Sequence, residues 1–298
     1  MEKISQNKFS QRHPLAFGFM LIIAAVATFM VAMAVFNFLF LGDRPGFRAG
    51  DTIGVVNVSG LITDSREVVD WINKLEEDDS IKAVIVRIDS PGGVVGPSQE
   101  IFSAVKDLGQ SRPVVASMGA VATSGGYYVA SAAHKIVSNP GTLTASIGVK
   151  ANLTSMQELM QKIGIEDQTV YSGKYKDAGS MTRPLTDEER AYFQELMDDM
   201  HEQFIQDVAQ GRNMSFEEMA RLADGRAMTG RQALEAGLVD VMGGMNQAVD
   251  TAREMADLKK DVTLLEGPVQ KVSFLRRILG NFSVEGSLSG PRWVFSYE

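Results

Sequence analysis

The chain has 298 residues, of which 45% are hydrophobic, enough to bury one large core or two modest ones. Its 37 acidic residues outnumber the 29 lysines and arginines, and the net charge of −8 argues against nucleic acid as a partner. Because the sequence contains no cysteine, disulfides, thiolate nucleophiles and cysteine-ligated metals are excluded.

An uncharged, strongly apolar run covers residues 15–41. As a helix it exceeds the roughly 30 Å of a bilayer's hydrocarbon core. A cleaved signal peptide is the alternative, but its apolar region would be shorter and would end in small residues, whereas this run ends in Asn-Phe-Leu-Phe-Leu. The sequence therefore predicts an uncleaved transmembrane anchor.

The charges beside this run predict its orientation. Three basic residues precede it in the tail 1–14 and two follow it in the linker 42–51, namely Lys3, Lys8 and Arg12 against Arg44 and Arg48. The slight excess before the run favours a cytoplasmic N-terminus. The rest of the chain is then expected outside the cytoplasm, held close to the membrane.

Beyond the linker, short apolar runs alternate with helical patterns, which indicates βαβ units and a mostly parallel sheet. The predicted strands are 52–58, 83–89, 114–118, 135–138 and 168–171, with a short strand-like segment at 142–149. The predicted helices are 65–76, 98–108, a helix after Ser124, 155–163, 186–210, 215–223, one between Gly225 and Gly244, and 245–258. For the tail 259–298, packing against its own domain is favoured over docking on another subunit or on the membrane.

Ser124 stands where a buried strand is predicted to pass into a helix, followed by Gly125 and Gly126. A serine in such a turn can expose its hydroxyl while the new helix supplies free backbone N–H groups. The alternative interpretation is an ordinary helix cap within a turn. The stretch alone does not decide between nucleophile and cap.

A second glycine-rich loop, 90–93, follows the strand 83–89 in the same way. Ligands bind at the carboxyl ends of parallel strands, so this loop and Ser124 are expected at one site. An N–H from Gly92 or Gly93 and that of Gly125 can together form a two-donor oxyanion hole. The alternative is a Pro-Gly-Gly turn without chemistry.

A nucleophilic serine needs a base, and the histidines are His13, His134 and His201. His13 is predicted on the other side of the membrane, His134 at a helix end as a cationic cap, and His201 on an exposed helix face. A lysine can replace histidine when burial favours the neutral amine. Lys174 and Lys176 lie on a loop bounded by glycines, so they are the alternative candidates.

Five motifs in order resemble those of the signal peptide peptidase A family, bacterial membrane serine proteases of peptidase family S49. They are Asp89-Ser-Pro-Gly-Gly93, Ala122-Thr-Ser-Gly-Gly-Tyr-Tyr128, Thr144-Ala-Ser-Ile-Gly-Val149, Ser172-Gly-Lys-Tyr-Lys-Asp177 and Gly225-Arg-Ala-Met-Thr-Gly230. The resemblance implies an α/β fold, a ClpP/crotonase-like superhelix of βαβ units over residues 52–258, preceded by one transmembrane helix.

The resemblance also implies the roles of the site residues. Ser124 is the nucleophile, Lys176 the general base, and Ser146 orients the lysine amine, while Gly93 and Gly125 form the oxyanion hole. The short form of the family assembles into a homo-oligomeric ring in which the lysine comes from a neighbouring subunit. From the residues alone, pairing within or between subunits stays open.

The resemblance predicts a membrane-anchored serine endopeptidase that needs no metal or cofactor. Its expected substrates are signal-peptide remnants in the bilayer and misfolded secreted proteins, on the extracytoplasmic or periplasmic face of a bacterial inner membrane. Two other functions remain compatible with the sequence. One is a crotonase-type acyl-CoA enzyme, which would use the oxyanion loops without a nucleophilic serine, and the other is a non-catalytic membrane scaffold.

Overall fold

The structure is a computed structural model that describes residues 13–36, 51–259, 261–268 and 295–297. It divides into two compact units, Met1–Arg48 and Ala49–Glu298. The predicted tail 1–14 and linker 42–51 lie almost entirely outside the described residues, and so do the charged residues that predicted the orientation.

The first unit contains α2 (Pro14–Phe36), which has no acidic residue in its first turn and no basic residue in its last. Within the described parts of the chain, no helix meets the length and apolarity required of a membrane span.

The second unit is built on a mostly parallel sheet with the strand order β10-β1-β2-β4-β5-β9. Neighbours along this path run parallel, and β6 adds to the end of β4 and pairs antiparallel with β8. The strands are β1 (Thr52–Ser59), β2 (Ile81–Ser90), β4 (Val114–Thr123), β5 (Lys135–Ser138), β6 (Leu143–Ala145), β8 (Ala227–Thr229), β9 (Val241–Met242) and β10 (Thr263–Gly267). The predicted α/β fold with a parallel-rich sheet is thereby confirmed.

Helices cover both faces of this sheet, as buried parallel strands require. One face packs against α3 (Arg66–Glu77), α4 (Val95–Gly109), α5 (Gly125–Ser131) and α7 (Asp187–Arg212) in the larger apolar core. The other face packs against α10 (Met245–Met255), whose Ala248 and Ala252 join Ile85 and Val115 in a second core. Two further short helices, α8 (Phe216–Leu222) and α9 (Gly230–Glu235), follow α7.

A second, small sheet has the order β3-β11-β7. Its strands are β3 (Gly93–Val94), β7 (Lys150–Ala151) and β11 (Phe295–Tyr297), and β11 is antiparallel to both neighbours. Part of the C-terminal tail therefore forms the middle strand of a sheet next to the predicted oxyanion loop. The segment 269–294, with the predicted patch 274–279, lies outside the described residues.

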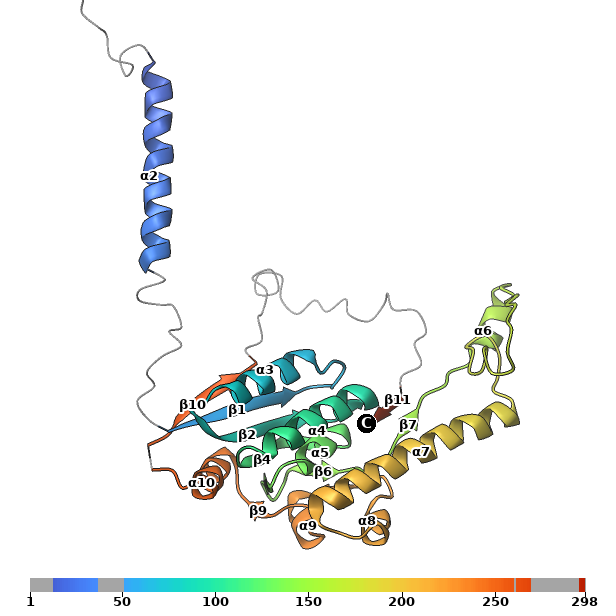
Figure 1. The fold of residues 1–298 in the computed structure, drawn as a ribbon. Coiled ribbons are helices and arrows are strands. Elements are labelled where there is room, and N and C mark those ends of the chain that lie inside the picture. The colour runs from blue at the N-terminus through green and yellow to red at the C-terminus, as the bar shows by residue number, and fades with distance from the viewer. Residues whose placement is uncertain (1–12, 37–50, 260, 269–294, 298) are drawn as a thin grey trace, which may run out of the picture. The chain divides into compact units, whose positions relative to one another are not determined.

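Residues 152–186, between β7 and α7, leave the body of the domain as an arm that carries α6 (Gln157–Lys162) (Figure 1). Most of its residues are exposed. The predicted strand 168–171 is wrong: no strand is assigned to these residues, and Val170 is 97% exposed. Thr169, Val170 and Tyr171 are residue types that favour strands, but this preference alone does not form a strand where there is no neighbouring strand to pair with.

Candidate active site

Ser124 joins β4 to α5 and has an unusual backbone conformation, with φ 53° and ψ −117°. A non-glycine residue in such a conformation costs about 1–3 kcal/mol, which the surrounding structure has to offset. The Ser124 N–H donates to Ala145 O at 2.7 Å, and its C=O accepts from the Tyr128 N–H at 2.8 Å. The side chain is fully buried, and Oγ has no hydrogen-bond partner among the described residues. The backbone N–H and C=O of Ser124 are thus both held by hydrogen bonds, while its side-chain hydroxyl forms none with the described residues.

The glycine loop after β2 lies directly against Ser124. Gly92 has φ +108°, and a Cβ placed on it would come within 2.8 Å of the Gly125 nitrogen and 3.1 Å of Ser124 Cβ. A Cβ on Gly125 would lie 3.2 Å from the Gly93 nitrogen. The structure therefore brings Gly93 and Gly125 together beside Ser124, as the sequence predicts for the two oxyanion donors. The first N–H groups of α5 have no acceptor within the helix, so that of Gly125 is available to a ligand.

Ser146 follows β6, which pairs with the end of β4 and so with the approach to Ser124. Ala145 and Ser146 both have positive φ, 60° and 54°. Ser146 N–H donates to Arg226 O at 3.0 Å, and its Oγ donates to Gly225 O at 3.2 Å. In this chain the hydroxyl therefore contacts the loop before β8, and no hydrogen bond joins it to a lysine among the described residues.

The two candidate lysines lie in different surroundings on the arm. Lys174 forms a hydrogen-bonded ion pair with Glu188. The hydrogen bond to this carboxylate raises the pKa of Lys174, so the amine is held in its charged form. Lys176 is exposed and lines a cavity of about 290 Å³ with residues 152–154 and 177–182. No hydrogen bond or ion pair joins its amine to another described residue. Of the two, Lys176 is the one whose amine is not already committed to a carboxylate.

An ion-pair cluster fastens the loop of Lys176 to the start of α7. Arg183 donates to Asp177 Oδ2 at 2.9 Å, to Asp177 O at 2.8 Å and to both carboxylate oxygens of Glu189. Glu189 also completes a capping box with Thr186. The hydrogen bonds from Arg183 lower the pKa of Glu189 to about 2. This cluster fixes the residue next to Lys176 relative to the long helix.

The C-terminal strand β11 occupies the edge of the site. It pairs Tyr297 with Gly93 and Ser296 with both Val94 and Lys150. A Cβ on Gly92 would come within 2.2 Å of Tyr297 O, so this carbonyl lies against the glycine loop. An extended peptide thus fits between β3 and β7 with a backbone carbonyl beside the predicted oxyanion donors.

The side chain of Tyr297 enters an aromatic cluster below the strand. Its ring stacks on Tyr128 with centroids 5.3 Å apart and lies 4.6 Å from Phe204. Phe102 packs against the other side of this cluster, 4.7 Å from Tyr128. Tyr297 is fully buried, and its hydroxyl has no hydrogen-bond partner among the described residues. The space that receives this side chain is lined by aromatic rings and suits a large hydrophobic residue.

Neither His134 nor His201 forms a hydrogen bond with the Ser124 hydroxyl. The Nδ1 atom of His134 accepts a hydrogen bond from the Val114 N–H at 3.1 Å, so this side chain contacts the start of β4. His201 is half-buried on α7, and its Nε2 is buried without a partner among the described residues, in contrast to the predicted exposed face. His13 belongs to the first unit.

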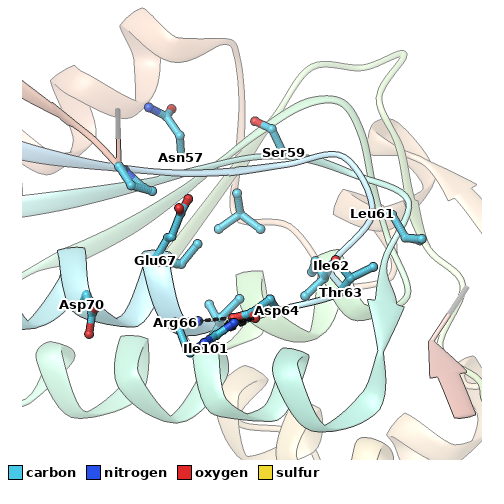
Figure 2. Close-up of a pocket in the computed structure, with 13 residues that line it drawn as sticks. Asn57, Ser59, Leu61, Ile62, Thr63, Asp64, Arg66, Glu67, Asp70 and Ile101 are labelled. Atoms are coloured by element: carbon cyan, nitrogen blue, oxygen red, sulfur yellow. Dashed lines mark hydrogen bonds and ion pairs between the residues drawn. The ribbon is translucent and has the colours of Figure 1, made fainter. Parts of the chain in front are cut away.

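A larger cavity, of about 900 Å³, lies beside β1, the following loop and α3 (Figure 2). The Asp64 and Arg66 side chains pair with each other at its wall, and Glu67 and Asp70 come from α3. None of the five predicted site residues lines it. Its link to the site is Ile62, whose N–H donates to Gly92 O at 2.8 Å.

The chain matches the family described as peptidase family S49 over residues 106–259. It is 40% identical to "Putative protease slr0021" of Synechocystis, over 78% of this chain and 84% of that one. It is 38% identical to the chloroplastic serine protease SPPA of Arabidopsis thaliana over 74% of this chain, which spans only 33% of that protein. It is 33% identical to "Putative signal peptide peptidase SppA" of Enterococcus faecium, over 76% and 70% of the two chains.

Proposed function

Because the chain belongs to peptidase family S49, we propose that it is a serine endopeptidase that works through Ser124 and Lys176. The observation that carries the proposal is the buried, strained Ser124, whose unpartnered hydroxyl stands beside the N–H groups of Gly93 and Gly125. A serine used only as a helix cap would accept a hydrogen bond from its helix, and Ser124 makes no such bond.

In the proposed reaction, Ser124 Oγ attacks the scissile carbonyl carbon while its proton passes to the neutral amine of Lys176. The negative charge that develops on the carbonyl oxygen is stabilised by the N–H groups of Gly93 and Gly125. The lysine ammonium then protonates the leaving amine as the C–N bond breaks. Water hydrolyses the resulting ester, with the lysine again accepting the proton. These steps use no metal or cofactor.

We further propose that Lys176 reaches Ser124 from a neighbouring copy of the chain in a ring-like oligomer. Within one chain the hydroxyl is buried and unpartnered while the lysine is exposed on the arm. The arm also exposes large apolar side chains, as expected of an interface surface: Met156, Leu159, Ile163, Ile165, Val170, Tyr171 and Tyr175. A neighbour that covers the arm would shield the amine from water, and Ser146 would then orient it.

The proposed substrate is an extended peptide that replaces β11 between β3 and β7. Backbone pairing with sheet edges binds such a peptide irrespective of its sequence, and the aromatic cluster around Phe204 favours a large apolar side chain. Signal-peptide remnants are apolar and fit this requirement, as do exposed segments of misfolded secreted proteins. The superhelical arrangement of the family is proposed for the body of the domain, 52–258.

We also propose that residues 15–41 anchor the protein in the bacterial inner membrane, with a cytoplasmic N-terminus and an extracytoplasmic catalytic domain. The support is the uncharged apolar sequence, part of which forms α2 (Pro14–Phe36). Alkaline carbonate extraction of cell membranes tests it: an anchored chain stays in the pellet, whereas a peripheral one is released.

The activity test uses the purified, detergent-solubilised protein with an apolar fluorogenic peptide and a fluorophosphonate probe. The wild type should cleave the peptide and bind the probe covalently at Ser124. Ser124→Ala and Lys176→Ala should each lose the activity, and His134→Ala, the matched control, should keep it. A wild type that neither cleaves peptides nor reacts at Ser124 would contradict the proposal and favour an acyl-CoA enzyme or a scaffold.

A further inference from the structure

Ser90 is the last residue of β2, fully buried, and stands at the base of the glycine loop. Its Oγ lies 2.6 Å from Gly60 O, 3.1 Å from the Gly92 nitrogen and 3.4 Å from Gly92 O. A serine hydroxyl has one hydrogen to donate, and the shortest contact is the one to Gly60 O. The hydroxyl therefore donates to Gly60 and accepts from the Gly92 N–H, which ties the loop after β1 to the glycine loop.

The loop after β1 holds the same glycine from its other side. Ile62 N–H donates to Gly92 O at 2.8 Å, and Ile62 O accepts from the Val94 N–H at 2.7 Å. Gly60 N–H in turn donates to Asp89 O at 2.9 Å, so this loop is itself fastened to the end of β2. Gly92 thus has its N–H bonded to the Ser90 hydroxyl and its C=O bonded to Ile62.

These bonds set the direction of the Gly93 N–H. In a planar trans peptide the C=O of one residue and the N–H of the next point in opposite directions. Since Gly92 C=O points at Ile62, the Gly93 N–H points away from the loop after β1. The Gly93 nitrogen lies near Gly125 on the other side, 3.2 Å from where a Gly125 Cβ would be.

We propose that Ser90 is a positioning residue for this enzyme: its hydroxyl fixes the Gly92–Gly93 peptide so that the Gly93 N–H faces the oxyanion. The inference rests on the proposed function, because it assigns Ser90 a task in the same reaction. Ser90 touches neither substrate nor nucleophile in this assignment. It acts through the glycine loop.

Without the hydroxyl, Gly60 O and the Gly92 N–H lose their partner, and the peptide that carries the Gly93 N–H is free to tilt. Outright loss of one oxyanion donor lowers kcat by about 100- to 1000-fold, so a misdirected donor should cost less than that. We expect Ser90→Ala to lower kcat by about 10- to 100-fold, because small misplacements of a catalytic group have effects of this size. KM should change little, since β3 and β7 still bind the peptide.

The matched control is Ser131→Ala. Ser131 is equally buried, and its hydroxyl donates to Tyr128 O at 2.7 Å within α5, away from the glycine loop. Thermal unfolding of both variants shows whether they fold. The kinetics are read as kcat and KM on the fluorogenic peptide, together with the inhibition constant of a peptide aldehyde, whose hemiacetal oxygen occupies the oxyanion site.

The expected result is a lower kcat for Ser90→Ala, an unchanged KM, and an aldehyde inhibition constant that rises in the same ratio as kcat/KM falls. Ser131→Ala should match the wild type in all three. An unchanged kcat and aldehyde affinity in folded Ser90→Ala would overturn the proposal. If Ser90→Ala does not fold, Ser90→Cys takes its place, because a thiol is a weaker hydrogen-bond donor than a hydroxyl. A kcat and an aldehyde inhibition constant equal to those of the wild type in Ser90→Cys would also overturn the proposal. If the wild type itself shows no hydrolysis and no labelling of Ser124, the proposed function fails instead.

Discussion

At the scale of single residues, the site depends on positions where the backbone departs from the common regions. Ser124, Ala145 and Ser146 have positive φ without being glycine, and Gly92 has φ +108°. Each of the three non-glycine conformations costs free energy that the rest of the fold must offset, whereas Gly92 adopts its positive φ without that cost. These residues cluster where the loops after β2 and β6 meet the start of α5. Backbone strain at this point is expected if it serves to place the Ser124 hydroxyl and the N–H groups of Gly93 and Gly125.

Gly92 allows a direct test of this arrangement. An alanine there would need φ +108° and would place its Cβ 2.8 Å from the Gly125 nitrogen. We expect Gly92→Ala to destabilise the domain by about 1–3 kcal/mol. It should also lower kcat/KM by at least about 100-fold, because the loop must move away from the oxyanion. Peptide hydrolysis and thermal unfolding measure the two effects.

The control for this substitution is Gly96→Ala. Gly96 lies in the first turn of α4 with nothing within 4 Å of a new Cβ, so alanine should keep activity and leave stability equal or slightly higher. If Gly92→Ala were as active and as stable as Gly96→Ala, the loop would not need this conformation.

The sequence predicted which two turns lie together, but not the backbone conformations and long-range contacts that hold them. The glycines around Ser124 and at 92–93 indicated tight turns at strand ends, and the structure brings both turns together. The bond from Ser90 to Gly60 joins residues 30 positions apart, and no local pattern reports such a contact. For the same reason the accepting role of His134 Nδ1 toward Val114 could not be read from the sequence.

At the scale of elements, the buried central strands were predicted, whereas short or exposed strands at the sheet edge were missed and the exposed segment 168–171 was wrongly predicted as a strand. The runs 83–89 and 114–118 are apolar and lie inside β2 and β4, but β2 continues to Ser90 and β4 to Thr123, the residue before Ser124. β10 was not predicted, because its residues are largely exposed at the sheet edge and lack a strong apolar alternation. β11 was not predicted either, because it has only three residues and its strand conformation depends on pairing with β3 and β7.

The position of β11 leads to a prediction about binding. A proline cannot be accommodated in the middle of a sheet, so Ser296→Pro should release β11 from β3 and β7. A tethered strand competes with substrate at high effective concentration, and its release should lower KM roughly threefold to tenfold with kcat unchanged. Steady-state hydrolysis of the fluorogenic peptide measures this. Ser296→Ala keeps the backbone N–H and should behave as the wild type; an unchanged KM for Ser296→Pro would mean that substrate binds elsewhere.

At the scale of the whole molecule, the proposed mechanism requires the Ser124 hydroxyl and the Lys176 amine to come together. Each folded chain presents both residues, yet the described structure of one chain leaves the hydroxyl buried without a partner and the amine exposed on the arm. The cluster of Arg183, Asp177 and Glu189 fixes the loop of Lys176 to α7, so large local rearrangement of this loop within one chain would have to break several charged hydrogen bonds. In the proposed oligomer, a neighbouring chain would supply the lysine without breaking these bonds.

Mixing two inactive variants separates the two arrangements. In an oligomer assembled from equal amounts of Ser124→Ala and Lys176→Ala chains, a site shared between neighbours is intact when the serine comes from one variant and the lysine from the other. Random assembly around a ring makes about a quarter of the sites intact, so about a quarter of the wild-type activity should return. The measurement is hydrolysis of the fluorogenic peptide after the two variants are co-expressed and co-purified through different tags. Sites formed within single chains would regain none, because every chain then lacks one of its two residues.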